Sequence, residues 1–151
     1  MIDLILSSII GGGAIFALYH TWRTGFSIPS GISMGMVAGI ALVLIPSKIM
    51  QASGIIIYIV GVFAALVYGI FQKELDTRSR LVVSLFSVSI LIYWFMRLTH
   101  LPGSYIVLLS SLLITAIVSI SGKLKLRNEL GFLTIMLADV LSIFAEKLLS
   151  I

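Results

Sequence analysis

The chain has 151 residues, of which 60% are hydrophobic and only 11% charged, and its mean hydropathy is +1.19. A soluble domain of this length could not bury that much apolar surface, so the composition indicates a membrane protein. The absence of cysteine excludes disulfides, thiolate metal sites and cysteine nucleophiles. The net charge of +4 comes from residues that flank apolar windows, which argues against a nucleic acid partner.

Apolar windows recur along the whole chain. About 20 residues of helix cross the ~30 Å hydrocarbon core of a bilayer. The pattern therefore predicts an all-α fold: a polytopic integral membrane protein in which a compact bundle of six transmembrane helices forms one domain over residues 1–151. The expected spans lie at about 3–22, 30–47, 53–72, 81–97, 103–121 and 130–148.

The first span is interpreted as a retained helix. It carries Asp3 where a signal peptide would carry basic residues, and it runs through Gly11, Gly12 and Gly13 without a cleavage site. Three glycines weaken a helix locally, so the triplet indicates either an interruption of the kind found in transport helices or, as we favour, a point where another helix crosses closely.

Small residues spaced four apart mark one face of the second and third spans. Such rows let helix backbones approach in a membrane, so we expect them to pack within the chain; a homo-oligomer interface is the alternative. The rows are Gly31, Gly35 and Gly39 in the second span, and Gly61, Ala65 and Gly69 in the third.

Arg97 and His100 lie three residues apart at the end of the fourth span and form a polar cluster on its outer side. Arg97 either pairs with Glu146 or extends into the lipid headgroups. His20 is expected on the opposite side of the membrane from His100. We therefore predict no metal site and no bound cofactor.

The segment from Phe95 to Gly103 reads Phe-Met-Arg-Leu-Thr-His-Leu-Pro-Gly. It resembles the F-K-x-x-H-x-P-G hairpin of GldL-like membrane proteins of gliding motility and type 9 secretion, with Arg97 at the family's lysine. The resemblance covers the fourth and fifth spans and implies a bacterial inner-membrane protein of the Bacteroidota. The intramembrane glutamate of that family has no counterpart in the fifth span, so the motor activity is not among the expectations.

Asp139 lies within the sixth span, about 15 Å from Glu129 by helix rise. A carboxyl at this depth faces the helix bundle, a partner or water. Ser142, Glu146 and Ser150 continue a polar stripe on the same helix. Asp139 is thus either a proton-titrating or ion-coupling site, or a neutral acid that is hydrogen-bonded to serines or threonines of the fifth span.

Lysine and arginine are distributed unevenly between the two sides of the predicted bundle. Seven lie on one side, against Lys48, Arg97 and Lys147 on the other; the seven are Arg23, Lys73, Arg78, Arg80, Lys123, Lys125 and Arg127. The positive-inside rule then predicts that both termini are non-cytoplasmic.

The sequence contains no paired catalytic set, so we do not expect an enzyme. The favoured function is a non-enzymatic inner-membrane subunit or scaffold. Its expected partners are the lipid bilayer and another membrane protein or a second copy of the chain. The alternative is a small proton-coupled transporter or channel that uses Asp139.

Overall fold

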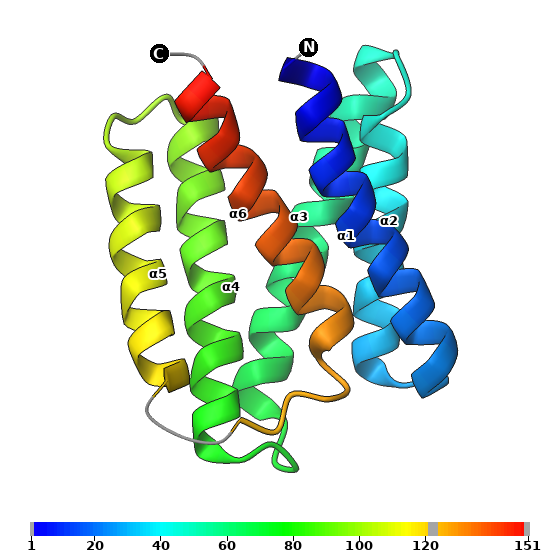
Figure 1. Ribbon diagram of the computed structural model, residues 1–151, viewed down its shortest axis with the longest axis vertical. Helices are drawn as coiled ribbons and strands as arrows, with labels where there is room; N and C mark the ends of the chain where they lie inside the picture. The colour runs from blue at the N-terminus through cyan, green and yellow to red at the C-terminus, as the bar shows by residue number, and fades with distance from the viewer. Residues whose placement is uncertain (1, 121–123, 150–151) are drawn as a thin grey trace. The chain divides into compact units, whose positions relative to one another are not determined.

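A computed structural model describes residues 2–120 and 124–149 and contains six α-helices (Figure 1). No strand occurs in these ranges. The helices are α1 (Ile2–Thr24), α2 (Ile28–Val43), α3 (Lys48–Phe71), α4 (Thr77–Leu98), α5 (Ser104–Ile120) and α6 (Leu130–Leu149). Lys123 and Ser150, which enter the predictions on charge and on the polar stripe, lie outside the described residues.

The all-helical fold is confirmed. Each predicted span coincides with one helix, and the ends differ by a few residues. Three helices are long and apolar enough to cross a membrane: Ile5–Thr24 of α1, α3 and α4. The apolar helices α2 and α5 are shorter, with 16 and 17 residues. α6 has 20 residues but carries Asp139, Glu146 and Lys147.

Side-chain caps determine where two of the helices begin. Ser27 is the N-cap of α2, where its hydroxyl accepts the Ser30 N–H at 3.4 Å. Asp76 is the N-cap of α4 and accepts both the N–H and the hydroxyl of Ser79, at 3.3 and 2.6 Å. Each cap satisfies N–H groups that have no partner within the first helical turn.

The chain forms two compact units, which are described separately. Unit 1 comprises residues 1–61 and 128–151, and unit 2 comprises residues 62–127. Helix α3 belongs partly to each unit. In unit 1, α1 packs along α6 and α2, and α2 also contacts α6; in unit 2, α4 packs along α5 (Figure 1). The prediction of a single domain stays a prediction.

Apolar side chains face outward over most of the helices. Large hydrophobic residues are exposed on every helix, including Ile15 on α1, Ile56 on α3 and Ile117 on α5. Contact with lipid is favourable for such side chains, whereas contact with water is unfavourable. This distribution agrees with membrane association.

Candidate functional site

Asp139 is buried within unit 1 and contacts a tyrosine of α3. Its side chain is 9% exposed, and its Oδ2 atom accepts a hydrogen bond of 2.8 Å from the Tyr58 hydroxyl. One turn along α6, the Ser142 hydroxyl donates to the backbone carbonyl of Asp139 at 2.7 Å. The carboxyl thus lies in the interior, as an acid in an apolar helix requires.

Tyr58 was not among the candidate residues in the sequence. One of the two alternatives for Asp139 was a hydrogen bond to serines or threonines of the fifth span, and it stays a prediction; within unit 1 the structure shows a hydrogen bond from Tyr58 of the third span. The sequence did contain a feature that points to Tyr58, because it is the single hydroxyl-bearing residue within the aliphatic run 55–60. Aromatic residues in membrane helices favour the interfaces, so a tyrosine far from both ends of α3 indicates a specific polar contact.

Two close helix contacts hold the residues of this pair in place. A Cβ atom added at Gly13 of α1 would lie 2.6 Å from the Cβ of Ala138, the neighbour of Asp139. A Cβ added at Gly39 of α2 would lie 2.9 Å from the backbone nitrogen of Tyr58. Small residues therefore bring α1 against α6 and α2 against α3 at the level of the pair.

The glycine triplet of α1 contributes to these contacts through one member. Among the described residues outside the neighbouring turns of α1, no atom lies within 4 Å of a Cβ built on Gly11 or Gly12, whereas Gly13 is closely packed. The predicted helix crossing is therefore at Gly13.

The two small-residue rows differ in what they contact. A Cβ on Gly31 or Gly35 would meet no described atom within 4 Å outside its own stretch of helix, so the expectation that the whole row of α2 packs within the chain stays a prediction. Only the Gly39 end of that row reaches the α2–α3 crossing, because straight helices that cross at an angle approach closely over a short length.

The row of α3 is in contact along its length. In unit 1, a Cβ on Gly61 would lie 2.7 Å from Met36 Cγ. In unit 2, Ala65 is buried, and a Cβ on Gly69 would lie 2.8 Å from Ser84 Oγ.

Three helices of unit 1 converge on Gly131 near the start of α6. A Cβ there would lie 2.6 Å from Ser33 Oγ of α2 and 3.6 Å from His20 Nδ1 of α1. Glu129, which precedes α6, is only 3% exposed. The sequence did not predict the burial of Glu129. No group of three or more potential metal ligands occurs among the described residues.

Arg97 and His100 lie in unit 2 at the end of α4. The Nη1 atom of Arg97 donates to the Tyr93 hydroxyl at 2.9 Å, and its guanidinium lies 6.0 Å from the ring centre of Tyr93 and 5.7 Å from that of Trp94. His100 is exposed and has a φ of 55°, in the left-handed region. Glu146 is half-buried in unit 1, so its pairing with Arg97 stays a prediction.

No protein-family model, no characterised protein and no solved structure matches this chain. The resemblance of residues 95–103 to the GldL-like hairpin stays a prediction.

Proposed function

We propose that the chain is a six-span protein of a bacterial inner membrane with both termini on the non-cytoplasmic side. Three long apolar helices, two shorter apolar helices and the burial of Asp139 in α6 support six crossings. The seven-to-three distribution of lysine and arginine supports the orientation.

Reporter fusions to the C-terminus test this topology. A green fluorescent protein fused after Ile151 should be dark, and an alkaline phosphatase at the same position should be active. A fluorescent and phosphatase-negative pair of fusions would contradict the orientation.

Within that membrane the chain acts as a non-enzymatic subunit or scaffold that packs against partner membrane proteins. This proposal rests on the small residues Gly31, Gly35 and Ala38 on one face of α2. No described atom outside the neighbouring turns of α2 lies within 4 Å of a Cβ position on Gly31 or Gly35, and Ala38 is exposed. Lipid tails gain little from such a surface. A second helix gains close backbone contact there, which is how transmembrane helices associate.

Native gel electrophoresis of mildly solubilised membranes tests the packing proposal. The wild-type chain should migrate above the mass of a monomer, and Gly35→Leu should lower that mass because leucine keeps the two helices apart. Gly12→Leu is the matched control, since Gly12 is equally open but lies on α1. A wild-type monomer, or an equal effect of both variants, would contradict the proposal.

A second candidate is a small proton-coupled transporter or channel. The Tyr58–Asp139 hydrogen bond favours this transport function, because the bond places two titratable groups together in the interior of unit 1. Proton flux across vesicle membranes distinguishes the two functions, since a purely structural acid carries none.

A further inference from the structure

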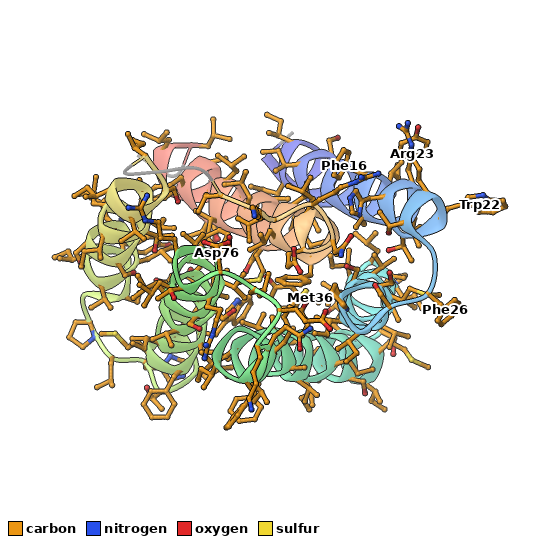
Figure 2. All side chains as sticks on the ribbon, turned by 90° about the horizontal axis from the view of Figure 1, so that it is seen from below. Phe16, Trp22, Arg23, Phe26, Met36 and Asp76 are labelled. Carbon is orange, nitrogen blue, oxygen red and sulfur yellow. The ribbon has the colours of Figure 1, made fainter. Side chains whose placement is uncertain are left out.

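The last turns of α1 and the connection to α2, residues 19–27 and here called the α1–α2 turn, expose three aromatic side chains. Trp22 and Phe26 are each 91% exposed, and Tyr19 is 61% exposed. Trp22 and Phe26 extend away from the helices, and Arg23 extends from the same end of α1 (Figure 2). The described residues of unit 1 leave Trp22 and Phe26 almost uncovered.

Hydrogen bonds within the turn satisfy several polar groups of this connection. Gly25, whose φ is +80°, ends α1 with its N–H donating to the Thr21 carbonyl at 3.1 Å. The Ser30 hydroxyl donates to the Gly25 carbonyl at 2.7 Å, and the Ser27 and Ser30 hydroxyl oxygens are 2.9 Å apart. The turn therefore satisfies much of its own backbone, which lowers the cost of leaving bulk water.

The α1–α2 turn carries a positive charge, and no acidic residue lies near it in the sequence. No aspartate or glutamate occurs between Asp3 and Glu74, whereas Arg23 lies inside the turn region and is exposed. Glu129, near the converging ends of α1 and α6, is buried. A surface that joins exposed tryptophan and phenylalanine with an arginine matches the boundary between acyl chains and anionic phosphates.

We propose that the α1–α2 turn, through Trp22, Arg23 and Phe26, is a membrane-interface anchor that selects anionic phospholipid headgroups. Trp22 and Phe26 lie at the level of the headgroups and upper acyl chains, and the Arg23 guanidinium binds lipid phosphate. The site is independent of the partner packing proposed for α2. A basic residue near an anionic membrane surface strengthens binding to that surface by a factor of about five.

Tryptophan fluorescence tests the proposal directly because the chain has only two tryptophans. The full chain with Trp94→Phe reports on Trp22 alone. It is reconstituted in vesicles of phosphatidylcholine and phosphatidylglycerol, with bromine on the acyl chains of one lipid or the other at the same mole fraction. Flotation with the vesicles verifies insertion.

Brominated phosphatidylglycerol should quench Trp22 more strongly than brominated phosphatidylcholine, and bromines near the headgroup should quench more than deep ones. Arg23→Gln should make the two lipids equal, whereas Lys48→Gln, which removes another exposed cation of unit 1, should leave the preference intact. Free inorganic phosphate should not remove the preference if the bound phosphate belongs to lipid.

Equal quenching by the two lipids in the parent protein would overturn the lipid selectivity. Trp22 emission that is insensitive to bromine on either lipid would overturn the anchor itself, because it would place the side chain in water or in a protein pocket.

Discussion

Gly39→Ala should destabilise the protein, whereas Gly35→Ala, four residues earlier on the same helix, should not. A Cβ at Gly39 would lie 2.8 Å from the Gly54 carbonyl oxygen, 2.9 Å from the Tyr58 nitrogen and 3.3 Å from the Tyr58 Cα. All three are backbone atoms of α3, so no side-chain rotation can relieve the contact. The two helices must separate, and overpacking of this kind costs about 1–3 kcal/mol.

Gly35→Ala is the matched control because the chemical change is identical. No described atom lies within 4 Å of its Cβ position. The substitution should then stabilise α2 by roughly 0.5–1 kcal/mol, since alanine favours the helix over glycine. The same gain in helix propensity applies at Gly39 and cancels in the comparison, so the two variants should differ in unfolding free energy by the overpacking cost, roughly 1–3 kcal/mol.

Thermal unfolding in detergent measures this difference. At about 2–4 °C per kcal/mol for a chain of this size, the melting temperatures of the two variants should lie several degrees apart. Equal shifts in the two variants, or a larger loss for Gly35→Ala, would refute the α2–α3 contact at Gly39.

Three further substitutions probe the buried and capping hydrogen bonds. Tyr58→Phe should lower the unfolding free energy by about 1–3 kcal/mol, because Asp139 loses the donor of its 2.8 Å hydrogen bond; an unchanged denaturation midpoint would argue against that bond. Ser87→Ala should raise stability by about 1 kcal/mol, since the buried Ser87 hydroxyl has no hydrogen-bond partner in the described part of the chain; destabilisation would reveal a partner. Hydrogen bonds from Ser79 lower the pKa of Asp76 from its ordinary value of 3.8, so the stability that Asp76 contributes is present above that value and is lost as the pH falls below it. In acid titrations followed by circular dichroism, Asp76→Asn should lack this component of the acid destabilisation, and a superimposable pH profile would refute it.

The positions of the helices follow from the sequence because the pattern of charge and hydropathy acts locally. Asp76 and Ser27 stop the apolar periodicity and cap the next helix, so the boundaries are visible in the residues themselves. The inward orientation of Asp139 also follows, because a carboxyl that faces lipid has no hydrogen-bond partner.

The contacts between helices could not be predicted in the same way. Gly35 and Gly39 belong to one regular row, yet of these two only Gly39 has a Cβ position that would meet described atoms of another helix. The spacing defines a face, whereas the crossing point depends on the angle between helices, which no local pattern encodes. Likewise, the partner of Asp139 is 81 residues away in the chain, and the register of α3 against α6 determines which hydroxyl reaches it.

Proton flux in reconstituted vesicles tests the proposed function most directly. Wild-type protein and Asp139→Asn are reconstituted at equal density with a pH-sensitive dye inside, and a pH gradient is applied. If the chain is a scaffold in which Asp139 serves packing, both forms should show the flux of empty vesicles. Flux above that background in the wild type, abolished in Asp139→Asn while its fold is retained, would contradict the scaffold and establish Asp139 as a proton-coupling residue, because asparagine cannot titrate.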